Sequence, residues 1–445
     1  MRIAFVPIDN RPVCYTLPRL IAEIDECVDF LMPSRDLLGD LTKSADVVGL
    51  FDWLMNIPKV DAIVLALDTV AYGGLIPSRR CSDNFETIKA RMQALKEILE
   101  EKECKIYAFS SIMRISNNNY NEEEKEYWSE WGKKIFEYSY NSHKSGMAMQ
   151  EDIPSEILND YINTRRRNFE INKLYLNWQK EGLFDTLIFS KDDCAEYGFN
   201  VYESQILEKM GGFIKTGADE IPMSLLSRAI QGELKICPIF IEPESKDLIS
   251  NYEDISIERS VKSQIELAGC KCCNQDEADI LLYVNNFKEH QGEIVMGVDT
   301  EGFSGEFEVP DRPYMIADVR FANGSDNGFI EALLKNNIKD KDFFGYAGWN
   351  TSANSLGSLI CGAKFKYFAG KYNKAAFDKL QITRFLDDWG YQANIRQNLS
   401  KTDIDILSEK MKNYEKVVGE KFGIDVVVKY IYPWDRLFEV EIELS

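Results

Sequence analysis

The feature that most constrains this chain is a series of short apolar runs, each of which ends abruptly in polar or glycine-rich residues. Runs rich in Val, Ile, Leu and Phe indicate strands that are buried on both faces, as in parallel sheets with helical connections. A shorter run at 27–33 indicates one more strand. The main runs cover residues 2–9, 62–69, 105–114, 186–193, 213–220, 235–242, 279–286, 314–324 and 343–357.

This pattern predicts an α/β fold with more than one domain. We expect a parallel, TIM-barrel-like N-terminal domain over residues 1–233, then a smaller doubly wound, Rossmann-like α/β unit over residues 234–370. Residues 117–185 are polar with aromatic side chains at helical spacing, which predicts a helical insertion. Its arginine run at 165–167 indicates a solvated helix face or ion-pair partners for local glutamates, rather than a phosphate site. Residues 371–445 should form a helical C-terminal region that ends in strands.

The charge and apolar content of the chain limit the kinds of binding partner that we expect. The chain has 52 Lys and Arg against 73 Asp and Glu, a formal net charge of −21. Because this charge repels phosphate backbones and anionic lipids, we expect neither nucleic acid nor a membrane as partner. No run reaches the roughly 18 apolar residues of a spanning helix, and the N-terminus lacks a signal-peptide layout, which predicts a cytoplasmic protein. Composition leaves open whether the chain forms a homo-oligomer.

Polar residues concentrate where the predicted strands end. The carboxyl ends of parallel strands meet at one edge of a sheet, so we expect these side chains to line one pocket. Those from the first five strand ends are Asp9, Arg11, Asp68, Tyr72, Arg114, Lys191, Asp192, Asp193, Asp219 and Glu220. Those from later strand ends are Asp318, Trp349, Asn350 and Asn354.

The adjacent carboxylates Asp192 and Asp193 are the sharpest of these signals. Like-charge repulsion and desolvation would raise one pKa, while Lys191 opposes that rise. One carboxyl would then act as general acid or base while the other holds substrate. The alternative is that such residues only cap a helix. For Asp219 and Glu220, an acidic binding site and a helix cap are equally well supported by the sequence.

Trp349, Asn350 and Asn354 combine an indole with amides, as sugar-binding sites do, although a capped helix with a core tryptophan fits them equally well. Only two histidines occur, at 143 and 290, which disfavours zinc hydrolases and Ser-His-Asp triads. The aspartates at the strand ends also suit an all-oxygen site for Mg²⁺ or Mn²⁺. No segment matches a nucleotide-binding glycine motif.

At VPIDNRPVCY, LDTVAYGGLIPSR, SSIMRIS, SKDDCAEYG, TGADE, DVRFANGSD and WNTSANSLG, the sequence resembles the bacterial family catalogued as domain of unknown function 4127. The resemblance covers residues 2 to about 370. It implies a link of some members to sugar catabolism and no defined activity.

The segment LIFSKDDCAEYG is also similar to the strand-end Asp-Asp of retaining β-N-acetylglucosaminidases of the O-GlcNAcase type. Those enzymes are TIM barrels that use the 2-acetamido group of the substrate as nucleophile. The likeness implies that Asp192 orients the acetamido nitrogen and that Asp193 is the general acid/base.

We therefore hypothesise a glycoside hydrolase (glycosidase) that acts on small N-acetylhexosamine-containing sugars, of the β-N-acetylhexosaminidase type, without a cofactor. One alternative is a metal-dependent phosphoester hydrolase or sugar isomerase. Another is a non-catalytic sugar-binding protein.

Overall fold

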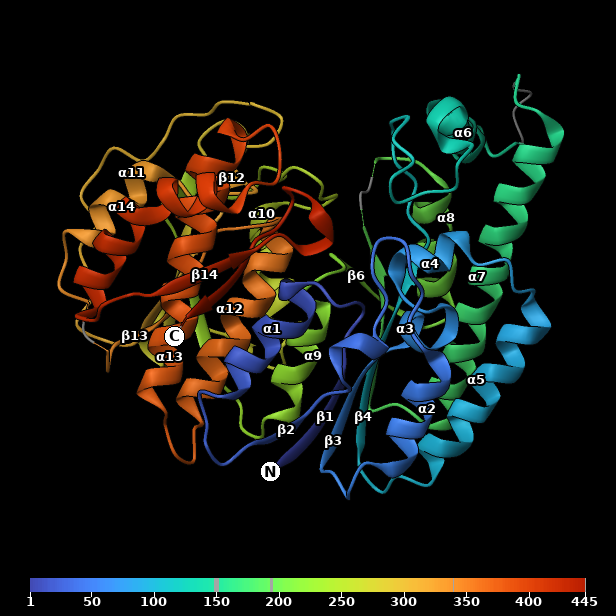
Figure 1. Cartoon of the computed structure of the whole chain (residues 1–445), viewed down its shortest axis with the longest axis horizontal. Coiled ribbons are helices and arrows are strands. Elements are labelled where there is room, and N and C mark those ends of the chain that lie inside the picture. Colours follow the sequence, from blue (N-terminus) through green and yellow to red (C-terminus); the bar gives the residue numbers. More distant parts are fainter. Residues whose placement is uncertain (148–151, 193–194, 339, 445) are drawn as a thin grey trace. The chain divides into compact units, whose positions relative to one another are not determined.

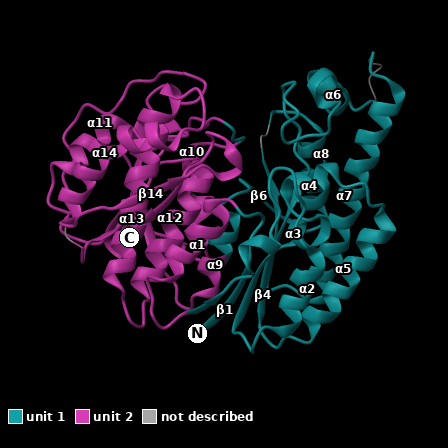
Figure 2. Cartoon of the chain, in the orientation of Figure 1, with its two compact units in different colours: residues 1–10, 29–225, 252–254 teal, residues 11–28, 226–251, 255–445 magenta. Residues whose placement is uncertain are grey.

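The protein is seen in a computed structural model that describes residues 1–147, 152–192, 195–338 and 340–444 (Figure 1). It divides into two compact units, each discontinuous in sequence (Figure 2). Unit 1 comprises residues 1–10, 29–225 and 252–254, and unit 2 comprises residues 11–28, 226–251 and 255–445. Each unit is built around a parallel sheet, so the predicted α/β class is confirmed.

Unit 1 holds a six-stranded parallel sheet with the order β2-β1-β3-β4-β5-β6. Its first five strands follow the order of flavodoxin-like open sheets. In the described part of the chain this sheet is open and forms no closed barrel, and the TIM-barrel-like arrangement stays an expectation. The strands are β1 (Arg2–Val6), β2 (Asp29–Leu31), β3 (Ala62–Ala66), β4 (Lys105–Ile112), β5 (Thr186–Lys191) and β6 (Phe213–Thr216).

The helices of unit 1 connect these strands. The segment after β4 and the helices α6 and α7 share a small hydrophobic core around Met113, Trp128, Ile135 and Tyr161. Figure 1 shows α7 as a long helix running beside α5. The helices are α2 (Val47–Asn56), α3 (Leu67–Tyr72), α4 (Leu75–Arg80), α5 (Phe85–Glu100), α6 (Trp128–Ser145), α7 (Ser155–Glu181) and α8 (Phe199–Lys209), with a 3₁₀ turn η1 (Arg35–Leu37).

Unit 2 holds a five-stranded parallel sheet with the order β13-β11-β9-β7-β8. When the five strands of this sheet are numbered from one in chain order, their order in the sheet is 2-1-3-4-5, which is also the order of the first five strands of unit 1. Its core is built from apolar residues of the sheet and of α10 and α12, among them Ile236, Val261, Leu282 and Leu356. The strands are β7 (Lys235–Phe240), β8 (Lys271–Cys272), β9 (Ile280–Asn285), β11 (Tyr314–Asp318) and β13 (Phe343–Ala347).

The other elements of unit 2 include two small sheets, β10 with β12 and β14 with β15. The boundary between residues 225 and 226 falls inside α9 (Ile221–Ala229). The helices are α1 (Pro12–Ala22), α10 (Ile257–Leu267), α11 (Asn327–Leu334), α12 (Ser352–Tyr367), α13 (Lys374–Arg384), the π-helix η4 (Phe385–Ile395) and α14 (Ile404–Phe422). The short elements are η2 (Pro243–Ser245), η3 (Gln275–Glu277), η5 (Arg396–Asn398), η6 (Pro433–Asp435), β10 (Gly292–Glu293), β12 (Phe321–Ala322), β14 (Val428–Ile431) and β15 (Glu441–Leu444).

In the described part of the chain, we find no helix with the length and apolar character needed to cross a membrane. The nine cysteines that the structure describes are all free thiols.

Candidate functional site

The carboxyl edge of the unit 1 sheet brings several predicted residues to one place. Ligands bind open α/β sheets where the strand order reverses, which here is between β1 and β3. Asp9 follows β1 and Asp68 follows β3, and their exposed fractions are 4% and 2%. Thr69 Oγ1 donates to the Pro7 carbonyl at 2.7 Å. This bond ties the two strand ends together and fixes the reversal point.

Asp68 is a buried acid of this edge with a raised pKa. It lies in the first turn of α3, and Oδ2 accepts a 2.7 Å hydrogen bond from the Ser111 backbone N–H at the end of β4. Burial raises the pKa of Asp68 to about 6, although hydrogen bonds from Ser111 and Ser110 oppose the rise. Tyr72, at the end of α3, is also buried. Its pKa lies well above the ordinary value because of burial and the Asp68 charge.

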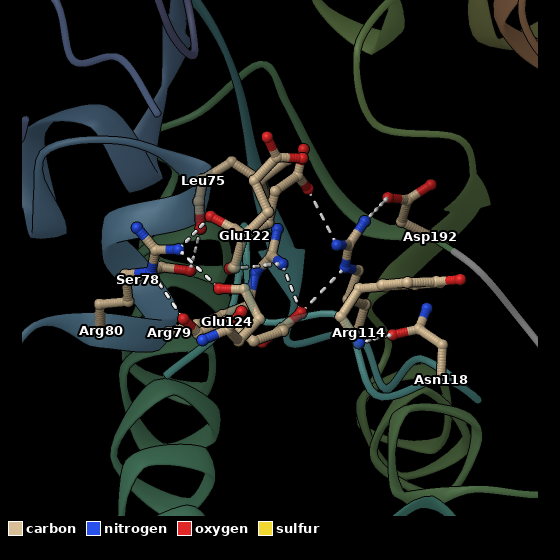
Figure 3. A network of polar contacts seen from close by, with 12 residues as sticks. Leu75, Ser78, Arg79, Arg80, Arg114, Asn118, Glu122, Glu124 and Asp192 are labelled. Atoms are coloured by element: carbon tan, nitrogen blue, oxygen red, sulfur yellow. Dashed lines mark hydrogen bonds and ion pairs between the residues drawn. The ribbon is translucent and has the colours of Figure 1, made fainter. Parts of the chain in front are cut away.

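Arg114 joins the end of β4 to the end of β5 (Figure 3). Its guanidinium contacts Glu124 at 3.2 Å through Nε and Glu123 at 2.9 Å through Nη2. A third, longer contact of 3.8 Å joins Nη1 to Oδ2 of Asp192. Arg114 therefore holds Asp192 by charge while acids of the following loop hold Arg114.

Two further arginines extend this network onto α4. Arg79 is 2% exposed and donates to Glu124 Oε1 at 2.6 Å, so Glu124 lies between two guanidiniums. Arg80 donates to the carbonyls of Leu41 and Glu124 at 2.9 Å each. Figure 3 shows both arginines beside the loop that carries Glu122 and Glu124. The network thus fixes residues 121–124 against α4.

The remaining predicted residues of unit 1 lie on the same edge. Lys191 ends β5, and its Nζ contacts Asp254 Oδ2 at 2.6 Å. Asp219 and Glu220 lie between β6 and α9, and Glu220 is 1% exposed. Asp193 lies outside the described residues. Arg114 contacts Asp192, and Asp68 lies close enough to Tyr72 to act on it by charge. Lys191 pairs with Asp254, a residue that the sequence did not single out.

The other five predicted residues belong to unit 2. Arg11 precedes α1, is 6% exposed and forms a 3.1 Å ion pair with Glu439. Trp349 is 2% exposed and packs edge-on against Phe438 with centroids 6.0 Å apart. Its ring faces are thus packed within the protein, which favours the core interpretation of this tryptophan. The remaining three are Asp318, Asn350 and Asn354.

Asn350 adopts a positive φ of 76° after β13. Its Oδ1 accepts hydrogen bonds from the Thr351 backbone at 2.8 Å and from Asn354 Nδ2 at 3.2 Å. A non-glycine residue in this region is uncommon and is enriched for asparagine. The Asn350 amide is therefore bonded within the segment that leads into α12, whose N-cap residue Thr351 makes no side-chain cap hydrogen bond.

Asp318 ends β11 within a buried polar network of unit 2. Burial and the charge of Asp326 raise its pKa to about 8. Tyr346 donates to its Oδ2 at 2.9 Å, and Asn285 donates to its Oδ1 at 2.8 Å. The adjacent Arg320 has no exposed surface and pairs with Glu242 at 2.8 Å. This network lies at the carboxyl ends of four strands, β7, β9, β11 and β13, and links them.

Sequence reasoning missed Glu123 and Glu124. The two glutamates lie in the segment 117–185, which the sequence marked only as a helical insertion. Their position soon after β4, before α6 begins, is the signal that the strand-end argument would have used.

No group of three or more His, Cys, Asp or Glu side chains is placed to hold a metal ion in the part of the chain that the structure describes. Over residues 3–443 the sequence matches a family described as Protein of unknown function (DUF4127). Neither a curated protein nor a solved structure matches the chain.

Proposed function

Because the chain belongs to the DUF4127 family, whose description names no activity, we propose a function from the carboxyl edge of unit 1: a glycoside hydrolase for small N-acetylhexosamine-containing sugars. The observation that carries the proposal is the Arg114–Asp192 contact at the end of β5, next to Asp193 in sequence. A carboxylate held by an arginine at a strand end has a defined direction and charge. The proposal needs adjoining strand ends and does not need a closed barrel.

The proposed reaction is substrate-assisted hydrolysis with retention. The carbonyl oxygen of the 2-acetamido group attacks C1 while Asp193 gives its proton to the departing glycosidic oxygen, so the C1–O bond breaks as the new one forms. Asp192 accepts the acetamido N–H and favours the charge that develops there. A water molecule, deprotonated by Asp193, then attacks C1 and restores the acetamido group.

Asp68 supports this assignment through its environment. Its pKa of about 6 places its titration close to neutral pH. Carboxyl groups of one site that experience different environments are the usual basis for dividing acid and base roles. Asp68 is hydrogen-bonded to β4, from which Arg114 also extends. We therefore propose Asp68 as a positioning residue that sets the charge near Arg114. A cytoplasmic location, where free thiols persist, belongs to the same proposal.

The test is hydrolysis of chromogenic N-acetyl-β-glucosaminide and N-acetyl-β-galactosaminide by the purified chain. We expect Asp193→Asn and Asp192→Asn each to lower kcat/KM by at least about 100-fold, the scale of general acid/base catalysis. Asp52→Asn, an exposed position on α2, is the matched control and should leave the rate unchanged.

Two further outcomes decide between this proposal and its rivals. EDTA should leave the rate unchanged, because the proposed reaction uses no metal; a loss reversed by Mg²⁺ or Mn²⁺ would instead support the metal-dependent enzyme. Binding of N-acetylhexosamines without any turnover would support a sugar-binding protein. Either result contradicts the hydrolase proposal.

A further inference from the structure

The edge strand β8 of the unit 2 sheet brings together cysteines from two parts of the chain. β8 pairs with β7 in parallel, and Ile236 lies opposite Cys272. The next residues in this register are Cys237 and Cys273. The Cys273 backbone N–H continues the ladder, since it donates to the Ile236 carbonyl at 3.0 Å. Cys237 and Cys273 are therefore neighbours on adjoining strands, and both belong to unit 2.

The side chains of these two cysteines lie on the same face of the sheet. Residues opposite each other on neighbouring strands point to one face, whereas consecutive residues of a strand point to opposite faces. Burial raises the pKa of Cys237, and the charge of Cys273 is the next largest cause of that rise, which requires the two thiols to be close. Neighbouring strands lie about 4.8 Å apart, within the Cα–Cα range of about 4.4 to 6.8 Å that a disulfide spans.

Other cysteines of this region are less suited to such a bond. Cys272 packs against the core of unit 2 on the opposite face and acts on Cys237 less strongly than Cys273 does. A bond between the consecutive Cys272 and Cys273 is disfavoured, because a planar trans peptide in an extended strand holds their side chains on opposite faces. Cys270 belongs to the same core, and Cys361 has no exposed surface, so water-borne reagents do not reach them readily.

Cys273 is the more accessible thiol of the pair. It is partly exposed just after the last residue of β8, whereas Cys237 is 7% exposed. In the described part of the chain, β8 has two residues and lies at the edge of the sheet. Few backbone hydrogen bonds therefore resist a small movement of Cys273 toward β7. A reagent in water meets Cys273 first, and Cys237 is the second thiol beside it.

We propose that Cys237 and Cys273 form a reversible disulfide by exchange with a small-molecule disulfide such as oxidised glutathione. The Cys273 thiolate attacks one sulfur of glutathione disulfide, which breaks its S–S bond and releases one glutathione thiolate. The Cys237 thiolate then attacks the Cys273 sulfur of the mixed disulfide and releases the second glutathione. The two cysteine protons pass through water to the two glutathione thiolates, so two protein thiols are oxidised and one disulfide is reduced. The bond fixes β8 to β7. This inference concerns unit 2 alone and does not rest on the proposed hydrolase activity.

The test is peptide mass spectrometry of the full, folded chain after incubation with oxidised glutathione, alkylation of the remaining thiols and cleavage with trypsin. We expect peptide 236–246 to be linked to peptide 272–288 with the loss of two hydrogens, about 2 Da. Dithiothreitol should separate the two peptides again. A chain that keeps both thiols, that carries only glutathione adducts, or that forms its cross-link through another cysteine overturns the proposal.

Variants identify the two sulfur atoms. Cys237→Ser should abolish the cross-link and leave glutathione attached to Cys273, because the thiol that expels it is missing. Cys273→Ser should also abolish the cross-link. Cys272→Ser is the matched control, and it should still form the cross-link, which assigns the bond within peptide 272–288 to Cys273.

Thermal melting establishes that each variant is folded. If Cys237→Ser does not fold, Cys237→Ala replaces it with the same expected loss, and the cross-link in the wild type is an independent readout. A cross-link that persists in either folded variant of the pair, or that disappears in folded Cys272→Ser, overturns the assignment. These measurements use no glycoside, so their failure is distinct from failure of the hydrolase assay.

Discussion

Oδ2 of Asp68 accepts the Ser111 backbone N–H at 2.7 Å, and this bond joins the turn after β3 to the end of β4. The bond favours the ionised carboxylate, but burial disfavours it more strongly, so the pKa of Asp68 rises to about 6. The buried acid at the reversal point of the sheet is therefore protonated in mildly acidic solution.

This shift predicts how stability depends on pH. The pKa of Asp68 is about 6 in the folded protein and near 4 in the unfolded chain. Between about pH 4 and 6, Asp68 is therefore more often protonated in the folded state than in the unfolded state. The free energy of unfolding should fall as pH rises through that window, by about 3 kcal/mol in total from this residue. Urea unfolding of wild type and Asp68→Asn from pH 4 to 8 measures the difference. If the two profiles are parallel, Asp68 does not titrate as stated.

Arg114 should matter for catalysis more than for stability. Arg114→Gln releases Asp192 and leaves Glu123 with one partner fewer. If the hydrolase proposal holds, kcat/KM for the chromogenic glycoside should fall about 10- to 100-fold, the scale expected when a reacting group loses its position. Arg114→Lys keeps the positive charge but lacks the planar guanidinium and its paired N–H donors, so its rate should lie between those of the glutamine variant and the wild type. A glutamine variant at the wild-type rate would contradict the positioning role.

We expect replacement of Arg320 to lower the stability of unit 2 by a large amount. Its guanidinium pairs with Glu242 at 2.8 Å and Asp326 at 3.3 Å and is fully buried. Arg320→Met would leave both acids without their common partner, so unfolding should become easier by about 3–5 kcal/mol. Guanidinium chloride unfolding measures this loss, with Arg259→Met as an exposed control expected within about 0.5 kcal/mol. A loss below about 1 kcal/mol would show that the network does not stabilise the unit.

The apolar runs predict the strands well because parallel strands buried on both faces must be continuously apolar. All five residues of β3 are buried, and each of the nine main runs contains a strand of one of the two large sheets. Where a helix begins inside such an apolar run, the sequence does not predict its first residue. Residues 62–69 read as one strand, yet the strand ends at Ala66 and α3 starts at Leu67, because Leu and Val suit either structure when buried.

The pattern of apolar and polar residues does not predict which side chains far apart in sequence contact one another. The run at 165–167 was expected on a solvated face or in ion pairs, and only Arg166 is exposed. Arg165 is 2% exposed and pairs with Glu203 of α8 at 2.8 Å, a partner distant in sequence and not one of the local glutamates that the run suggested. Arg167 is also buried and donates to backbone carbonyls of Ser78 and Asp83. Tertiary packing, rather than local sequence, decides which of the three arginines meets water.

The last prediction compares two helical glycines. Replacing glycine by alanine inside a helix normally stabilises it by up to about 1 kcal/mol. At Gly132 on α6, however, a Cβ would overlap the Asn118 carbonyl oxygen and lie 2.5 Å from Trp128 Nε1. We expect Gly132→Ala to destabilise the protein by about 2 kcal/mol, as overpacking does.

Gly362 on α12 is the matched control. A Cβ there would meet Leu380 at 3.6 Å and Ile21 at 4.0 Å, which are ordinary contact distances. Gly362→Ala should therefore be neutral or stabilising. Thermal melting of both variants checks the pair. Equal shifts in Tm would mean that the loop after β4 yields to α6, and the rigid placement of residues 114–124 inferred from the Arg114 network would then be wrong.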